Sequence, residues 1–227
     1  MSKTSQTNLR IPGPTPVTPE ILKEMSHFMI NHRGDGFRRL IESVTVRLKK
    51  IYETSEDLHI LTASGTGAME AAIVNTLSPG DSVLAITIGA FGDRFANLAE
   101  MYGANVKIIR SELGEAADPD TVKSCLNNHP DIKAVLVTHN ETSTGVTNDL
   151  ETIAKIVKND FGKLLLVDGV SSVGSVPLKT DSWKCDAVAS ASQKGWMAPP
   201  GLAFLSFSLE SWKANSCSTM PKFYFDL

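Results

Sequence analysis

Residues 82–102 read Ser82-Val-Leu-Ala-Ile-Thr-Ile-Gly-Ala-Phe-Gly-Asp-Arg-Phe-Ala-Asn-Leu-Ala-Glu-Met-Tyr102. The largely apolar stretch at residues 82–88 predicts a buried strand, and a glycine-flanked turn follows it. Residues 94–102 are expected to form a helix, and residues 106–110 the next strand. This order predicts two parallel strands joined by a crossover helix.

The same alternation continues along most of the chain. Short continuous apolar runs are typical of strands that helices cover on both faces. The expected strands are residues 58–62, 82–88, 106–110, 134–138, 164–167, 187–191 and 202–206, and the expected helices among them are residues 67–77, 94–102, 119–127 and 150–161. The pattern predicts an α/β fold with a mostly parallel, doubly wound sheet, in which ligands bind at the carboxyl ends of strands.

The N-terminal region has a different character. Four prolines in residues 11–19 are incompatible with a helix or a central strand, so residues 1–18 are expected to form an extended arm. Helices are expected at residues 19–29 and 37–52. In the second of these, Leu40, Val44, Leu48 and Ile51 share one apolar face. Residues 19–227 are expected to form one large domain.

The composition is that of an ordinary globular protein: 227 residues, 42% apolar and 21% charged, with a net charge of −3. The weak acidity argues against nucleic acid or an anionic membrane as partner. There is no apolar run of about 20 residues, and the polar N-terminus lacks the apolar region of a signal peptide. The three cysteines are widely spaced and form neither a metal pattern nor a disulfide framework. A cytoplasmic location without a bound metal is therefore expected.

Lys194 and Asp168 are the first candidate site residues. Lys194 lies between a predicted buried strand and a turn rich in glycine and proline, and Asp168 ends the apolar run Leu164-Leu-Leu-Val-Asp168. A lysine in a pocket typically acts as a neutral amine, either to form a Schiff base or as a general base. With a strand-end carboxylate, it suggests a pyridoxal-phosphate site, in which the lysine holds the aldehyde and the carboxylate pairs with the ring nitrogen. An exposed loop lysine and a helix-capping aspartate remain the alternative.

Three further turns follow predicted strands. The turn Thr62-Ala-Ser-Gly-Thr-Gly67 precedes a helix and could cradle a phosphate with its amides and hydroxyls, although a simple helix cap would look the same. Phe91, in the turn at residues 89–94, could stack on a flat heterocycle or belong to the core. In residues 138–145, Thr142 could donate to a phenolate oxygen, whereas His139 and Glu141 could be ordinary loop residues.

Together these segments resemble the class V aminotransferases of the fold-type I pyridoxal-phosphate enzymes, and in particular the alanine–glyoxylate, serine–glyoxylate and serine–pyruvate aminotransferases. The resemblance extends over nearly the whole chain in family order. It is carried by residues 12–14, 64–72, 79–81, 89–92, 138–146, 167–174, 192–194 and 198–201.

The resemblance implies a role for each matching residue. Lys194 corresponds to the Schiff-base lysine, Asp168 to the partner of the pyridinium nitrogen, and Gly13 to the N-terminal turn that lines the substrate pocket. The remaining cofactor-binding residues implied are Ser64, Gly65, Thr66 and Gln193 at the phosphate, Phe91 on the ring, and Thr142 near the ring oxygen. The implied reaction moves an amino group from a small amino acid, serine or alanine, to a 2-oxo acid, glyoxylate or pyruvate. A homodimer is implied as well.

The family pattern continues into a smaller C-terminal domain that holds the arginine for the substrate carboxylate, and that domain is expected to be absent here. Arg33 and Arg94 do not match that arginine. A non-catalytic fragment is therefore one alternative. A cysteine desulfurase or selenocysteine lyase is another, although those enzymes have His before the lysine, where Gln193 stands here. An NAD-binding domain is disfavoured because Gly-x-Gly-x-x-Gly is missing.

Overall fold

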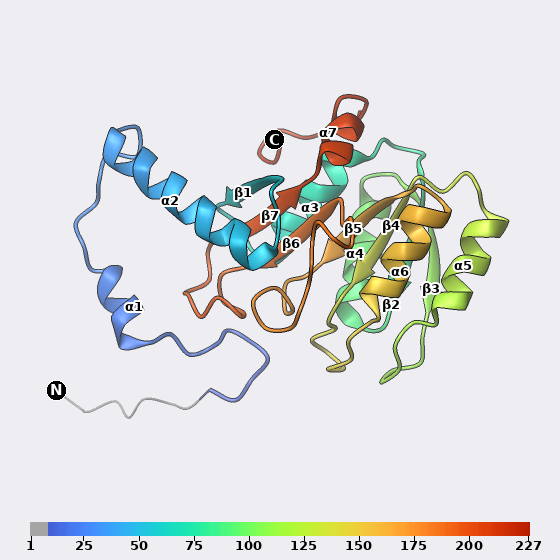
Figure 1. The fold of residues 1–227 in the computed structure, drawn as a ribbon, viewed down its shortest axis with the longest axis horizontal. Coiled ribbons are helices and arrows are strands. Elements are labelled where there is room, and N and C mark those ends of the chain that lie inside the picture. Colours follow the sequence, from blue (N-terminus) through green and yellow to red (C-terminus); the bar gives the residue numbers. More distant parts are fainter. Residues whose placement is uncertain (1–8) are drawn as a thin grey trace.

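Seven strands form one sheet at the centre of the molecule, in the order β1-β7-β6-β5-β4-β2-β3 (Figure 1). The structure, a computed structural model, describes residues 9–227, so residues 1–8 of the predicted arm lie outside the described residues. The strands are β1 (Asp57–Leu61), β2 (Ser82–Thr87), β3 (Asn105–Arg110), β4 (Ala134–Thr138), β5 (Leu164–Asp168), β6 (Ala187–Ala191) and β7 (Ala203–Phe207).

The predicted mostly parallel, doubly wound sheet is confirmed. β3, β2, β4, β5 and β6 pair in parallel, and only β7 runs antiparallel to its neighbours β6 and β1. The parallel strands therefore end at one common edge. There, Thr138 of β4 lies opposite Asp168 of β5 in the register.

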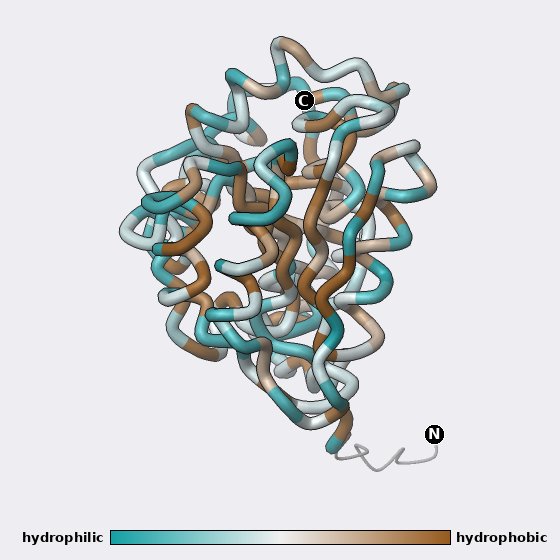
Figure 2. Tube along the Cα trace, turned by 90° about the vertical axis from the view of Figure 1, so that its right-hand side faces the viewer, coloured by the Kyte–Doolittle hydropathy of each residue, from teal (hydrophilic) through white to brown (hydrophobic). Residues whose placement is uncertain are grey.

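Helices cover both faces of the sheet because alternate residues of each strand point to opposite sides. In β2, Leu84 and Ile86 enter one hydrophobic cluster, and Val83 and Ala85 the other. The first cluster is covered by α2 (Asp35–Tyr52), α5 (Pro119–Asn128), α6 (Leu150–Ala154) and η1 (Lys155–Asp160), and the second by α3 (Gly65–Thr76), α4 (Ala90–Met101) and α7 (Leu209–Asn215). Figure 2 shows the apolar strands inside the molecule and hydrophilic segments towards the outside.

Some helices differ from the sequence-based expectations. The helix expected at residues 19–29 ends early, as α1 (Pro19–Glu24), and Phe28 beyond it is fully exposed, so no packing extends the helix. The expected helix at residues 150–161 changes from α to π geometry at Lys155, and α7 was not anticipated.

On the apolar face of α2, Leu48 is buried but Leu40 is exposed, because α1 and the first half of α2 project away from the sheet (Figure 1).

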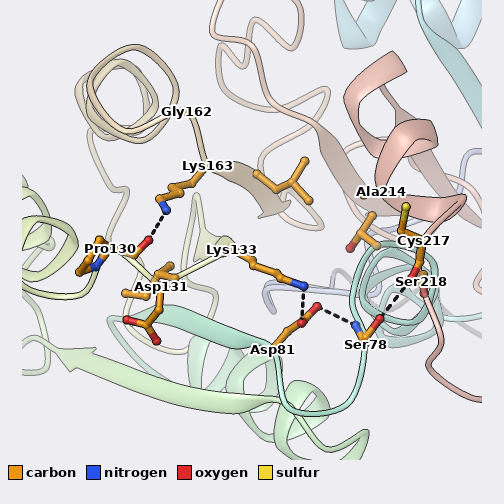
Figure 3. Close-up of a pocket in the computed structure, with 13 residues that line it drawn as sticks. Ser78, Asp81, Pro130, Asp131, Lys133, Gly162, Lys163, Ala214, Cys217 and Ser218 are labelled. Carbon is orange, nitrogen blue, oxygen red and sulfur yellow. Dashed lines mark hydrogen bonds and ion pairs between the residues drawn. The ribbon is translucent and has the colours of Figure 1, made fainter.

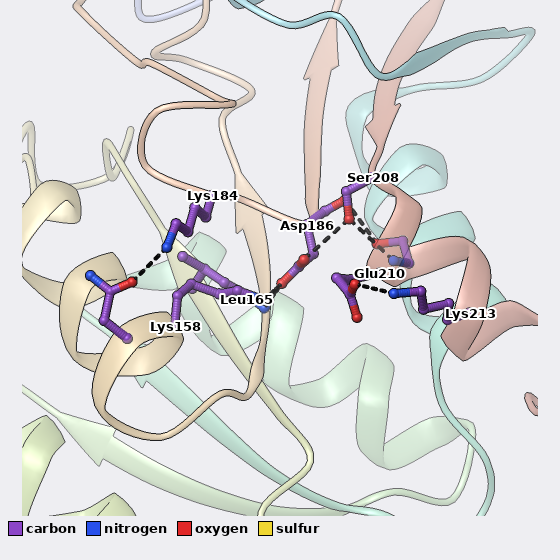
Figure 4. Close-up of polar contacts among 9 residues, drawn as sticks. Lys158, Leu165, Lys184, Asp186, Ser208, Glu210 and Lys213 are labelled. Atoms are coloured by element: carbon purple, nitrogen blue, oxygen red, sulfur yellow. Dashed lines mark hydrogen bonds and ion pairs between the residues drawn. The ribbon is translucent and has the colours of Figure 1, made fainter.

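A buried ion pair ties together the opposite edge of the sheet, where β5 and β6 begin (Figure 4). Asp186, with only 2% of its surface exposed, accepts hydrogen bonds from the Lys158 ammonium, the Leu165 amide and the Ser208 hydroxyl. These donors come from η1, from β5 and from the residue before α7. One carboxylate thus connects three elements. The energetic cost of burying its charge is offset only while these hydrogen-bond partners are present.

None of the helices within residues 9–227 combines the length and the apolar character that crossing a membrane requires. Within the same residues, His, Cys, Asp and Glu form no group of three or more that could hold a metal ion.

Candidate active site

A cavity of about 400 Å³ opens at the edge where the parallel strands end. Segments that are far apart in sequence meet there: the N-terminal turn, the start of α3, the start of α4 and the loops after β5 and β6. The predicted site residues that line it are Gly13, Ser64, Gly65, Thr66, Phe91, Gln193 and Lys194.

Asp168 lies beneath this cavity as the last residue of β5. Its side chain is buried, and it accepts hydrogen bonds from the Val170 amide at 2.9 Å and from the Thr138 hydroxyl at 3.3 Å. Burial raises the pKa of Asp168 to about 6, and these hydrogen bonds oppose the rise. A cationic N–H beside this carboxylate would favour its ionised form. Since Val170 lines the cavity, Asp168 is two residues from its wall.

Lys194 follows β6 and extends under the N-terminal turn. Its ammonium donates to the Pro12 carbonyl at 2.8 Å. Burial lowers the pKa of Lys194, and the charge of Asp168 opposes the decrease. Thr15 holds the turn in place, because its amide donates to the Gln193 carbonyl and its hydroxyl to the Lys194 carbonyl. The amine thus lies between the arm and the sheet edge.

Gly13 is the position in this turn that admits no side chain. A Cβ there would lie 2.8 Å from the Lys194 Nζ, and its φ of +145° is a backbone conformation that other residues rarely adopt. The close approach of arm and lysine therefore depends on this glycine.

The N-terminus of α3 presents free hydrogen-bond donors to the cavity. Ser64 is the N-cap residue, but its side chain makes no capping hydrogen bond, so its hydroxyl is not consumed by the helix. The first amides of a helix have no partner within it and carry partial positive charge. A Cβ at Gly65 would lie 2.6 Å from Val170 Cγ2. The turn therefore fits closely against the β5 loop and offers its donors to an anion.

Phe91 is held in the cavity wall by Glu141, a residue that the sequence suggested could be an ordinary loop acid. Glu141 is fully buried, and its carboxylate accepts hydrogen bonds from the amides of Phe91 at 3.0 Å and Gly92 at 3.1 Å. It also accepts from the amide and the hydroxyl of Ser143. The carboxylate thus caps α4, which explains why this helix begins at Ala90 rather than at the expected residue 94.

Arg94 is a second residue whose position the sequence did not reveal. Its guanidinium lies 4.7 Å from the centre of the Phe91 ring, and its Nη1 donates to the Thr66 hydroxyl at 3.2 Å. It also lines the cavity. The one available signal was its place, three residues after Phe91 and therefore on the same side of a helix.

Two residues of the loop after β4 are placed differently. Thr142 is half-buried and is not among the residues that line the cavity. His139 is buried with its ring edge-on to Trp183, and burial lowers its pKa to about 4. His139 is therefore neutral at neutral pH and packs as part of the core.

A larger cavity, about 460 Å³, lies at the opposite edge of the sheet (Figure 3). Its charged groups already have hydrogen-bond partners: Lys133 pairs with Asp81, Lys163 donates to the Pro130 carbonyl, and Asp131 accepts from the Ser82 hydroxyl. Asp81 also accepts from the Ser78 amide. The convergence of an amine, a carboxylate and a helix N-terminus is found at the other edge, which makes the smaller cavity the candidate active site.

Comparisons with known proteins agree with this geometry. The family model for aminotransferase class-V matches residues 7–217. A crystal structure of alanine–glyoxylate aminotransferase from Nostoc sp. superposes with a TM-score of 0.93 at 31% identity, covering 100% of this chain and 61% of that one.

Two curated relatives show the range of names attached to similar sequences. A serine–glyoxylate aminotransferase of Methylorubrum extorquens is 37% identical, over 96% of this chain and 57% of its own length. A protein named soluble hydrogenase, small subunit, from Synechococcus sp. is 46% identical, over 96% of this chain and 58% of its own length. The chain thus spans somewhat more than half the length of these relatives. With a family match over nearly all of its residues, the chain belongs to the class-V aminotransferase family.

Proposed function

We propose that this chain provides the pyridoxal-phosphate-binding part of an aminotransferase. The reaction would move an amino group from a small amino acid, serine or alanine, to a 2-oxo acid, glyoxylate or pyruvate. The observation that supports this most directly is that Lys194 and the α3 N-terminus line one cavity, while the charge of the buried Asp168 beneath it acts on the pKa of Lys194. The names of the aminotransferases similar to this chain support the substrate class.

The residues at the cavity fit the three chemical parts of pyridoxal phosphate. Ser64, Gly65 and Thr66 would hold the phosphate at the helix N-terminus. Asp168 would pair with the ring nitrogen, and Lys194 would take the aldehyde. Gln193 also lines the cavity, and its side-chain NH2 group is the donor that would reach the phosphate. When bound, the cofactor supplies an aldehyde that accepts amines and a ring that withdraws electrons from the substrate carbon.

The chain's own groups would bind, orient and move a proton. Burial lowers the pKa of Lys194, so a larger fraction of its amine is neutral and able to attack a carbonyl or accept a proton at Nζ. Asp168 is fixed by two hydrogen bonds, so its carboxylate is already oriented. Phe91 would cover the ring, and Glu141 would keep Phe91 in place through the backbone.

The wider setting is part of the same proposal. Residues 9–18 would act as an arm over the site and residues 19–227 as the cofactor domain. Thr142 would donate to the ring oxygen, a role that rests on the family resemblance alone because Thr142 does not line the cavity. The functional form would be a cytoplasmic homodimer. The neighbouring exposed apolar side chains of Phe28 and Met29 offer surface that a partner subunit would cover.

The test is an absorption titration of the purified chain with pyridoxal phosphate. We expect a visible band in the wild type and in Lys163→Ala, a matched lysine variant at the other edge of the sheet, and no band in Lys194→Ala. Addition of serine or alanine should then bleach the band. A wild-type chain that gives the same spectrum as Lys194→Ala would refute the proposal for this chain and favour the non-catalytic alternative.

A further inference from the structure

Arg94 brings an unpaired positive charge to the candidate active site. Within residues 9–227 its guanidinium has no carboxylate partner, although the neighbouring Asp93 is paired, with Arg110. The nearby acid Glu141 is occupied by the amides and hydroxyl described above. An arginine that lines a cavity without a salt-bridge partner among the described residues is suited to an anionic ligand.

The position of this charge is fixed from two sides. Nη1 donates to the Thr66 hydroxyl, and the guanidinium lies against the Phe91 ring. A guanidinium has five N–H donors in a planar fork, so most of them remain free after the bond to Thr66. Since Thr66 is in the first turn of α3, the arginine adds a full charge to the partial positive charge of that helix N-terminus.

We propose that Arg94 binds the phosphate of the cofactor directly and so selects the phosphorylated form of pyridoxal over the unphosphorylated form. This inference rests on the proposed function and assigns one more residue to its site. A phosphate is favoured over a substrate carboxylate because the contact of Arg94 is with the helix turn at Thr66, where amide donors also converge. Arg94 is then a binding residue of the phosphate site.

The test compares Arg94→Met, Arg94→Lys and wild type with three probes: pyridoxal phosphate, pyridoxal and inorganic phosphate. Binding of the two aldehydes is followed by absorbance, and binding of phosphate by the rise in melting temperature of the cofactor-free chain. Arg110→Met is the matched control, because Arg110 is an exposed arginine paired with Asp93 and lies outside the cavity.

We expect Arg94→Met to weaken pyridoxal phosphate and inorganic phosphate on the order of 10-fold, as for loss of a charge-assisted hydrogen bond, and to leave pyridoxal affinity unchanged. Arg94→Lys should restore part of the loss, and Arg110→Met should behave as wild type. Equal losses for pyridoxal phosphate and pyridoxal would overturn the inference, because Arg94 would then act through the Phe91 ring.

The measurement of inorganic phosphate binding separates this inference from the proposed function. Lys194→Ala should lose the visible band and still bind inorganic phosphate in an Arg94-dependent way. A wild-type chain with no Lys194-dependent band but Arg94-dependent phosphate binding would refute the proposed function and leave the anion site standing. A chain that binds neither pyridoxal phosphate nor phosphate would refute both.

Discussion

Replacement of Asp168 by asparagine should stabilise the cofactor-free chain at neutral pH and at the same time weaken cofactor binding. Asp168 is buried, and burial raises its pKa from 3.8 to about 6. Asparagine has nearly the same shape, and its side-chain oxygen can still accept from the Val170 amide. The substitution therefore removes the buried charge while it keeps the local hydrogen bonding.

The size of the effect follows from the two pKa values. A rise from 3.8 to about 6 corresponds to about 3 kcal/mol of unfavourable ionisation in the folded state, at roughly 1.4 kcal/mol per pKa unit. Between these values the folded chain holds a proton that the unfolded chain has lost, so stability falls as pH rises through this window. The full cost is present above about pH 6 and absent below about pH 4.

Urea denaturation of both proteins at several pH values measures this directly. Groups common to the two proteins cancel in the difference, so Asp168→Asn should gain about 3 kcal/mol near neutral pH and almost nothing near pH 4. Its affinity for pyridoxal phosphate should decrease, because a neutral amide does not favour a protonated ring nitrogen. A stability difference that is the same at all pH values would show that burial does not control this carboxyl group.

Two further substitutions test the packing around the site and the opposite edge of the sheet. Gly65→Ala should cost about 1–3 kcal/mol of unfolding free energy, because the new Cβ would lie 2.6 Å from Val170 Cγ2, and the added substitution Val170→Ala should recover most of it in urea denaturation. Lys158→Met should cost about 3–5 kcal/mol by leaving the buried Asp186 carboxylate unpaired. Lys155→Met, at an exposed position, should change the free energy of unfolding by less than about 0.5 kcal/mol. A similar loss of unfolding free energy in both lysine variants would contradict this account.

The fold was predictable to a large extent because its elements follow from local patterns. The central strands β4, β6 and β7 are buried at every residue, so their sequences are largely apolar and differ clearly from the polar turns around them. β4 and β6 begin and end where the sequence predicts. The antiparallel direction of β7 was not visible in the same way, because an apolar run has no direction and only its pairing with β6 and β1 decides it.

Helix ends were less predictable because distant residues determine them. α4 begins early since Glu141, fifty residues later, accepts hydrogen bonds from its first amides. α1 ends early since the apolar residues that follow it, Phe28 and Met29, contact nothing that would hold a longer helix. Local propensity is a weak preference that tertiary contacts override.

The sequence by itself determined which chemical groups follow which strands. It placed Lys194, Asp168 and the turn at residues 62–67 after predicted strands, and parallel strands bring such residues to one edge. The individual roles of these residues stay predictions until cofactor binding is measured. Only the tertiary structure decided which groups make contact. Arg94 donates to the Thr66 hydroxyl, 28 residues away in sequence, and Lys194 donates to the Pro12 carbonyl, 182 residues away. Periodicity reports the neighbours along one element, whereas these contacts depend on strand order and loop paths, which local sequence does not encode.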